Sequence, residues 1–223
     1  MTEAFLVSGG GGGVGAAVCR SLANAGYIPI VGYHSTSKIA ETIAEETGGR
    51  TIHLDLTDQN TINLTVETLT DEPLAGVVLA ASPPPVIGPF GRIEDEDMRL
   101  QWEVNVVGPQ RLCAGLIKGC FRKRKKGTVI GILTAAMGTP SQGATGNMGA
   151  YVIAKYGLQG LLAALKGEFP WLTTASLSPG YINTPMLEAF DKRFIEIVRQ
   201  NQNITSPEEI AEDILALIRM EWS

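Results

Sequence analysis

Tyr151 and Lys155 lie four positions apart in the segment YVIAK. On a helix, residues at this spacing share a face, so a phenol and an ammonium group would lie one turn apart. Reduction of a carbonyl needs a proton donor beside the developing alkoxide, and a phenol can serve if a nearby cation lowers its pKa. A Tyr and a Lys at this spacing are also common on ordinary helix surfaces. The pair therefore indicates acid–base chemistry on a carbonyl or alcohol only with support from elsewhere in the chain.

A glycine-rich segment, SGGGGGVG from Ser8 to Gly15, follows a strand-like run and precedes a helical pattern that starts at Ala16. Backbone amides at a helix N-terminus can bind a pyrophosphate, and glycine allows the phosphates to approach closely. Five adjacent glycines satisfy several spacing templates by accident, and a flexible turn is the alternative. The strand before and the helix after favour a dinucleotide-binding loop.

The second strand-like run ends at Tyr33, where a fold that selects NAD usually has an acidic residue for the ribose hydroxyls. Here the chain has His34, Ser35 and Thr36, followed by Lys38, and no Asp or Glu. These side chains would offer donors to a 2′-phosphate. The sequence therefore favours NADP over NAD.

Strand-like and helix-like segments alternate along the chain. The strand-like runs are Ala4–Val7, Ile28–Tyr33, Thr51–Leu54, Gly76–Ala80, Thr128–Leu133 and Thr174–Leu177. The segments with helical periodicity are Gly15–Ala25, Lys38–Glu46, Thr61–Leu69, Met98–Phe121, Met148–Phe169 and Pro207–Met220. This alternation predicts an α/β fold, a three-layer Rossmann-type doubly wound parallel sheet of about six strands in a single domain over residues 1–223. The functional site should then lie at the carboxyl ends of the strands.

The composition fits a small-molecule enzyme. The chain has 223 residues, of which 44% are hydrophobic and 18% charged, and its net charge of −5 gives no attraction to nucleic acid or anionic membranes. Its three cysteines fall in helix-like segments, and neither a signal peptide nor a bilayer-spanning stretch is visible. We therefore expect a cytoplasmic protein with no nucleic-acid partner, no membrane partner and no metal site.

Three further segments have simple structural interpretations. Pro83–Pro85 follows the fourth strand and could form a wall of the site. The acidic run Glu94–Asp97 precedes a long helix and suits its positive end, whereas the basic run Arg122–Lys126 suits the negative end. A nucleic-acid or localisation patch is the alternative interpretation of the basic run.

Taken together, SGGGGGVG and YVIAK resemble the TGxxxGxG and YxxxK motifs of the short-chain dehydrogenase/reductase family. Asp55-Leu56 is similar to the family's Asp-apolar pair at the adenine, and Asn105-Val106 to its Asn in the long helix. SPGYINT, from Ser178 to Thr184, is similar to its SPGxxxT. The matches occur in the family's order from residue 5 to about 187. The part up to Asn105 is most similar to 3-oxoacyl thioester reductases.

The resemblance implies roles for individual residues. Tyr151 would be the general acid/base, Lys155 would lower its pKa and hold the nicotinamide ribose, and Asn105 would anchor a proton-relay water. The implied cofactor contacts are Ser8, Gly9, Gly13, Val14, Gly15, His34, Asp55, Leu56, Ala81, Lys155, Pro179, Gly180, Ile182 and Thr184.

The chain departs from the family pattern at three places. The family's catalytic Ser is replaced by Thr134 after the fifth strand, with Ser141 in the following Gly-rich loop as a competing hydroxyl. The family's Asn-Asn-Ala-Gly becomes LAAS at residues 79–82, which loses the amides that tie that strand to its neighbour. The usual final strand is missing after the last helix-like segment.

These observations predict an NADP(H)-dependent reductase of a ketone or 3-oxoacyl group. Two alternatives remain: a dinucleotide-binding relative with little turnover that acts as a sensor or partner subunit, and a dihydropteridine-type reductase. A largely apolar carbonyl substrate is expected, because the pocket-framing segments supply Pro83, Pro84, Pro85, Ile87, Phe90, Met137, Met148, Met186, Leu187 and Phe190. Residues 185–205 would cover the substrate. Apolar faces on the two long helices predict a homodimer, with a tetramer possible.

Overall fold

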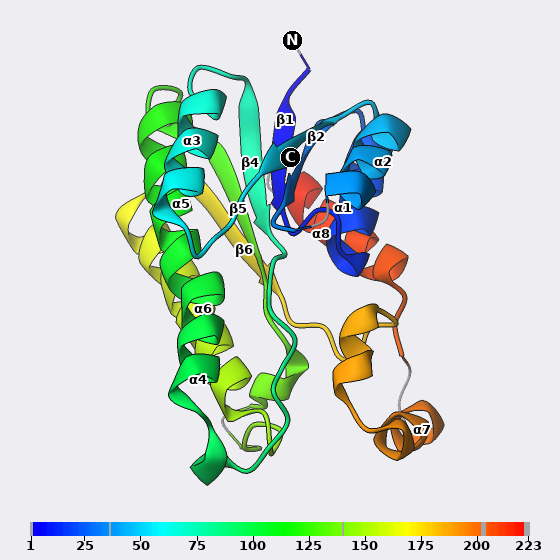
Figure 1. The fold of residues 1–223 in the computed structure, drawn as a ribbon. Helices are drawn as coiled ribbons and strands as arrows, with labels where there is room; N and C mark the ends of the chain where they lie inside the picture. Colours follow the sequence, from blue (N-terminus) through cyan, green and yellow to red (C-terminus); the bar gives the residue numbers. More distant parts are fainter. Residues whose placement is uncertain (1, 36, 140, 202–203, 221–223) are drawn as a thin grey trace.

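A computed structural model describes residues 2–35, 37–139, 141–201 and 204–220, and its centre is a parallel sheet of six strands (Figure 1). The strand order is β3-β2-β1-β4-β5-β6. The strands are β1 (Ala4–Ser8), β2 (Ile28–Tyr33), β3 (Arg50–His53), β4 (Leu74–Leu79), β5 (Gly127–Ile132) and β6 (Leu172–Leu177). All five strand pairs are parallel. The predicted three-layer, doubly wound fold is therefore confirmed.

Helices cover both faces of the sheet, as a parallel sheet requires. On one face lie α3 (Gln59–Leu69), α5 (Gly108–Leu116) and α6 (Gly149–Glu168); on the other lie α1 (Gly13–Asn24), α2 (Ser37–Thr47) and α8 (Pro207–Met220) (Figure 1). Each face has its own apolar core, around Phe121 on the first side and around Phe5 on the second. The two cores hold the strands rigidly, so their carboxyl ends can position chemistry.

The strand order reverses direction at β1, which lies between β2 and β4. The chain winds outward to β3 on one side and to β6 on the other. Ligands of such sheets bind where the order reverses, in the crevice outside the carboxyl ends. That edge is where the loops after β1, β4 and β5 meet.

The expected helix over Met98–Phe121 is longer and less regular than its periodicity suggests. It consists of α4 (Asp95–Trp102), a π-helical turn η2 (Glu103–Val107), α5, and a second π-helical turn η3 (Ile117–Phe121). A π turn widens the helix by one residue per turn, and such turns are frequent at functional sites. Asn105 lies in the middle of the first of them.

Residues 185–205, expected as a covering segment without assigned secondary structure, contain a short 3-10 helix η5 (Pro185–Ala189) and the helix α7 (Lys192–Asn201). Residues 202 and 203 of this segment lie outside the described residues. Both helices lie beyond the carboxyl ends of the strands (Figure 1). The sequence interpretation did not assign α7, although its apolar residues recur at helical spacing.

The charged runs lie where a purely structural role would place them. Asp95, Glu96 and Asp97 form the first turn of α4. In the basic run, Arg124 donates to the carbonyl of Leu74, and the Lys125 ammonium lies 5.4 Å from the ring centre of Trp171.

The three cysteines are buried free thiols. Among the helices of the described residues, none combines the length and the hydrophobicity that crossing a bilayer requires.

Candidate active site

The glycine loop is shaped by contacts that exclude larger residues. Gly9 has φ +67°, and a Cβ there would lie 2.8 Å from the Cα of Ala81. A Cβ on Gly15 would lie 2.2 Å from the carbonyl oxygen of Gly9. The helix α1 begins at Gly13 after Gly12, which provides no side-chain cap. Gly12 therefore caps none of the first-turn amides, which belong to Gly13, Val14 and Gly15. Free amides at a helix N-terminus are the groups that bind phosphates.

Ser8 ties the end of β1 to the loop after β4. Its hydroxyl lies 3.5 Å from the carbonyl oxygen of Val78 and accepts from the amides of Ala80 and Ala81 at 3.2 and 3.3 Å. Replacement of the family's Asn-Asn-Ala-Gly by LAAS therefore does not leave the two strand ends unconnected. The link comes from β1, and it holds Ala81 against the glycine loop.

The expected adenosine end of the site contains Asp55 and His34. The Asp55 carboxylate accepts from the amide and hydroxyl of Thr57 at 2.8 and 2.7 Å, and lies 3.4 Å from Nε2 of His34. Partial burial raises the pKa of Asp55, but the bonds from Thr57 and the nearby histidines outweigh this and lower it. Leu56 is buried, with its carbonyl oxygen against Gly108. Thus Asp55 is held ionised at this edge.

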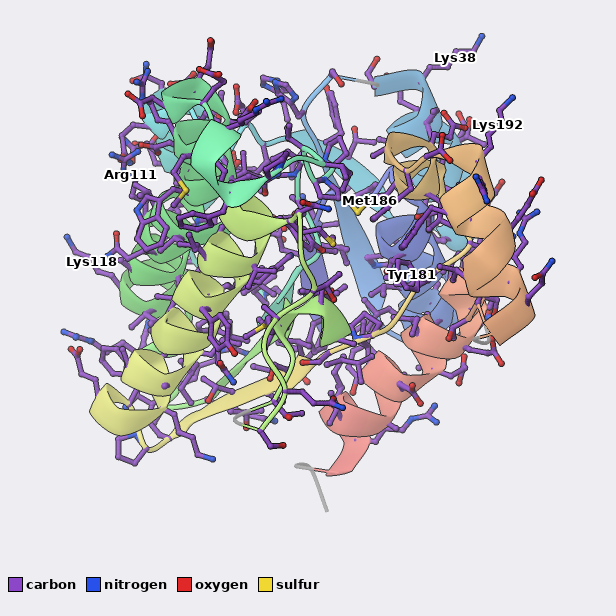
Figure 2. The ribbon with its side chains drawn as sticks, turned by 90° about the horizontal axis from the view of Figure 1, so that it is seen from below. Lys38, Arg111, Lys118, Tyr181, Met186 and Lys192 are labelled. Carbon is purple, nitrogen blue, oxygen red and sulfur yellow. The ribbon has the colours of Figure 1, made fainter. Side chains whose placement is uncertain are left out.

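The expected 2′-phosphate donors are mostly exposed at the same edge. The side chain of His34 is 69% exposed, and Ser35 and Lys38 are also exposed. Thr36 lies outside the described residues. Figure 2 shows Lys38, at the start of α2, pointing outward. None of the described positions from 33 to 38 has an acidic side chain.

Tyr151, Lys155 and Thr134 come together at the carboxyl end of β5. Tyr151 and Lys155 lie one turn apart on α6, and the Lys155 ammonium is 5.5 Å from the Tyr151 ring centre. Lys155 is 2% exposed and donates to the Ile132 carbonyl at 2.9 Å. Burial lowers the pKa of Lys155 to about 7. Burial raises the pKa of Tyr151, and a hydrogen bond with Thr134 partly offsets that rise.

The two competing hydroxyls lie in different environments. Thr134 is buried just beyond β5, where its hydroxyl also accepts from the amide of Ala136 at 3.2 Å. Ser141 is exposed in the following loop, and its hydroxyl lies 3.1 Å from that of Thr139. Of the two, Thr134 is the one whose side chain acts on the pKa of Tyr151, lowering it.

Asn105 is buried in the π turn at 1% exposure. Its amide nitrogen donates to the backbone carbonyl of Gln101 at 3.0 Å and to the side-chain oxygen of Gln101 at 3.2 Å. Its Oδ1 has no hydrogen-bond partner within the described part of the chain. A buried, unpaired acceptor of this kind costs free energy unless something donates to it.

The segment after β6 closes the other side of the site. Pro179 is buried, and its carbonyl oxygen accepts from Ala135 at 2.8 Å, whereas Gly180 is exposed. Ile182 forms a parallel bridge with Thr205. A Cβ on Gly13 would lie 2.6 Å from Cγ2 of Thr184. The glycine loop and this segment are therefore in close contact at Gly13, where there is no room for a larger residue.

Aromatic rings hold the covering segment near the phenol. Phe190 packs against the buried cluster of Met148, Tyr151 and Val152. Its ring stacks on that of Phe194 at 5.3 Å, and Tyr181 meets both rings edge-on at 5.8 Å. Figure 2 shows Tyr181 and Met186 between the two helical sides of the molecule. Tyr181 and Phe194 were not singled out in the sequence, since aromatic residues far apart in a chain carry no local signal.

Comparison with known proteins agrees with this geometry. The short chain dehydrogenase family matches residues 3–193. The chain belongs to the short-chain dehydrogenase/reductase family. Members of this family are oxidoreductases that use a nicotinamide dinucleotide. Acetoacetyl-CoA reductase of Paracoccus denitrificans is 28% identical over 225 residues, covering 97% of this chain and 90% of that protein.

Two solved structures show the same fold. A 3-ketoacyl-(acyl-carrier-protein) reductase from Brucella melitensis in complex with NADH has a TM-score of 0.85 and 21% identity, covering 96% of this chain and 90% of that one. An actinorhodin polyketide ketoreductase variant with NADPH has a TM-score of 0.83 and 24% identity, with 97% and 90% covered. At these identities the likeness establishes the fold and not the substrate.

The described residues fit a nicotinamide dinucleotide of this family. The uncapped start of α1 suits the pyrophosphate, and the glycines at positions 9 and 13 keep the backbone open beside Ala81 and Thr184. Lys155 and Tyr151 lie at the carboxyl end of β5 for the nicotinamide end.

Proposed function

We propose that the protein reduces a ketone, of the 3-oxoacyl type, to an alcohol with NADPH, and that Tyr151 is the general acid. The observation that supports this most strongly is the meeting of Tyr151 with Thr134 and with the buried Lys155 at one strand end. An ordinary helix surface does not bury an ammonium group beside a phenol. The similarity to acetoacetyl-CoA reductase supports the substrate class.

When bound, the nicotinamide supplies the hydride that is added to the carbonyl carbon. The Tyr151 hydroxyl donates its proton to the carbonyl oxygen as negative charge develops there. Thr134 donates a hydrogen bond at the same place and orients the substrate. The Lys155 ammonium stabilises the phenolate that remains, and the buried surroundings of both residues keep water from competing.

The preference for NADP rests on the end of β2. His34 and Lys38 provide positive or donor groups, and none of the described residues from 33 to 38 is acidic. His34 also approaches Asp55, so it can join the adenosine edge to the phosphate. Calorimetry with NADPH and NADH tests this preference: tighter binding of NADPH is expected, and equal or reversed affinities would contradict it.

The proposal of a largely apolar substrate rests on the covering segment, residues 185–205. Two backbone hydrogen bonds bring the two ends of this segment together. The amide of Asn183 donates to the Thr205 carbonyl at 2.9 Å, and the amide of Thr205 donates to the Tyr181 carbonyl at 3.0 Å. Between these points Phe190 reaches the Tyr151 cluster. The specificity constant should rise with each methylene added to a 3-oxoacyl chain until the pocket is full, by about 0.8 kcal/mol per buried methylene. A flat or falling series would contradict an apolar pocket.

Turnover itself is tested by NADPH oxidation against acetoacetyl-CoA, longer 3-oxoacyl thioesters, diketones, quinones and a quinonoid dihydropterin, with Tyr151→Phe as the matched control. We expect turnover with the 3-oxoacyl compounds and its loss in the variant. Turnover restricted to the pterin would favour the dihydropteridine alternative. Tight NADPH binding without turnover of any compound would favour a sensor or partner subunit.

A homodimer is proposed from the outer face of α4 and α6. Leu100, Trp102 and Tyr156 are 46%, 38% and 48% exposed there, which is unusual for such large apolar side chains. Light scattering at micromolar concentration should give a dimer mass, and a monomer mass would refute the pairing.

The buried free thiols favour a cytoplasmic location.

A further inference from the structure

Gln101 is a buried polar residue that connects two parts of the site. It lies in the last turns of α4 and is 2% exposed. Its Nε2 lies 2.9 Å from the carbonyl oxygen of Pro84 and 3.5 Å from that of Pro83, in the loop after β4. Its Oε1 lies 3.2 Å from Nδ2 of Asn105. A glutamine this deeply buried is costly unless its amide is satisfied on both sides.

The orientation of both side-chain amides is fixed by backbone carbonyls. A carbonyl oxygen can only accept, so the Gln101 atom that faces Pro83 and Pro84 must be the nitrogen. Its oxygen then faces Asn105, which must present its own nitrogen to that oxygen and to the Gln101 backbone carbonyl. The Asn105 oxygen is thereby forced to the opposite side. No other assignment of the two amides satisfies these acceptors.

The forced orientation leaves Oδ1 of Asn105 as a hydrogen-bond acceptor on the side away from Gln101. Oδ1 of Asn105 is buried and has no partner among the described residues. The π turn that carries it packs against α6, where Gly157 leaves room for Val106 and Trp102.

We propose that Gln101 is a positioning residue that holds the Asn105 amide in this orientation and couples it to the Pro83–Pro84 loop. This rests on the proposed function, because a proton relay through a water at Asn105 matters only if Tyr151 must be reprotonated. Gln101 touches no reacting atom; it acts through Asn105. The sequence signal was available: a glutamine four residues before Asn105, on the same helix face.

The test compares Gln101→Met with a matched control. Methionine has a similar length but neither donates nor accepts strongly, so the Asn105 amide would be free to turn. We expect kcat to fall by roughly tenfold to a hundredfold, with the Kd of NADPH unchanged. The control, Leu112→Ala, opens the core of α5 without touching Asn105, so it should lower the melting temperature while kcat at low temperature stays near wild type. An unchanged kcat in folded Gln101→Met overturns the proposal.

A double-mutant cycle separates positioning from a general structural effect. If Gln101 acts through Asn105, Gln101→Met should add no further loss of kcat in the Asn105→Ala background. Independent, additive losses in the double variant would contradict the proposed coupling.

A crystal structure of the wild-type protein tests the same inference without turnover and without a variant. A water within hydrogen-bond distance of Asn105 Oδ1 is expected, with the Gln101 nitrogen toward Pro84. A reversed Asn105 amide would overturn the positioning role. If the crystal contacts are as expected but no carbonyl compound is reduced, the proposed function fails while the amide geometry stands.

Discussion

Replacement of Lys155 by Met should stabilise the protein while abolishing its chemistry. Burial lowers the pKa of Lys155 from 10.5 to about 7. At about 1.36 kcal/mol per pKa unit this corresponds to about 5 kcal/mol by which the fold disfavours the ammonium. Met has similar length and no charge, but it leaves the Ile132 carbonyl without its donor, which costs about 1–3 kcal/mol. The net expectation is a gain of about 2–4 kcal/mol near pH 6, in the absence of nucleotide.

The dependence on pH follows from the direction of the shift. Below about pH 7 Lys155 is protonated in both the folded and the unfolded chain, so the folded state is destabilised by the full free energy of burying the ammonium. Between about 7 and 10.5 the unfolded chain binds a proton that the folded chain does not. The free energy of unfolding of the wild type should therefore rise with pH in this window, by up to about 1.4 kcal/mol per unit. Lys155→Met should lose this part of the slope.

Urea unfolding at about pH 6 and about pH 9 measures both effects. Lys166→Met, on the exposed part of the same helix, is the control and should change neither the free energy of unfolding nor its slope by more than about 0.5 kcal/mol. The reasoning is refuted if Lys155→Met is less stable than wild type near pH 6. Equal slopes in the two proteins between pH 7 and 9 would refute it as well.

Four other substitutions test the site directly. Tyr151→Phe should remove nearly all turnover and leave NADPH affinity almost intact, as measured by kinetics and calorimetry; an active variant would exclude Tyr151 as the acid. Thr134→Ala should lower kcat by about a hundredfold, whereas Ser141→Ala should leave it near wild type, and the reverse ranking would move the donor into the loop. Gly13→Ala should weaken NADPH binding at least about tenfold, since its Cβ would lie 2.6 Å from Cγ2 of Thr184. Unchanged affinity in that variant would show that the loop can move aside.

Much of the architecture is determined locally by the sequence. The glycine run between β1 and α1 is required by contacts that leave no room for a Cβ at Gly9 and Gly15. A run of glycines at this place in the sequence therefore predicts the tight loop that the structure has. The alternation of strands and helices specifies a parallel sheet, because the connections are long enough for helical crossovers and crossovers have one hand. Tyr151 and Lys155 could be paired from their spacing alone, since the helix fixes which residues share a face.

The tertiary structure decided what depends on contacts between distant segments. Which of the Thr134 and Ser141 hydroxyls lies near Tyr151 depends on the path of the chain after β5, and spacing along the sequence does not give that path. The link from Ser8 to Ala80 and Ala81 spans more than seventy residues, so the sequence could not show how the two strand ends stay connected at residues 79–82. The depressed pKa of Lys155 likewise arises from burial, a property of the assembled core.

The π turn around Asn105 is a further feature that depends on the tertiary structure and not on the local sequence. Its residues have ordinary helical propensity, and a periodic pattern does not reveal where one extra residue widens a helix. Whether Gln101 faces solvent or the loop at Pro83 and Pro84 depends on how the β4 loop returns over α4. Local propensity and hydrophobic pattern therefore determined the elements and their order, whereas long-range packing determined the protonation, the orientation and the partners of the groups between them.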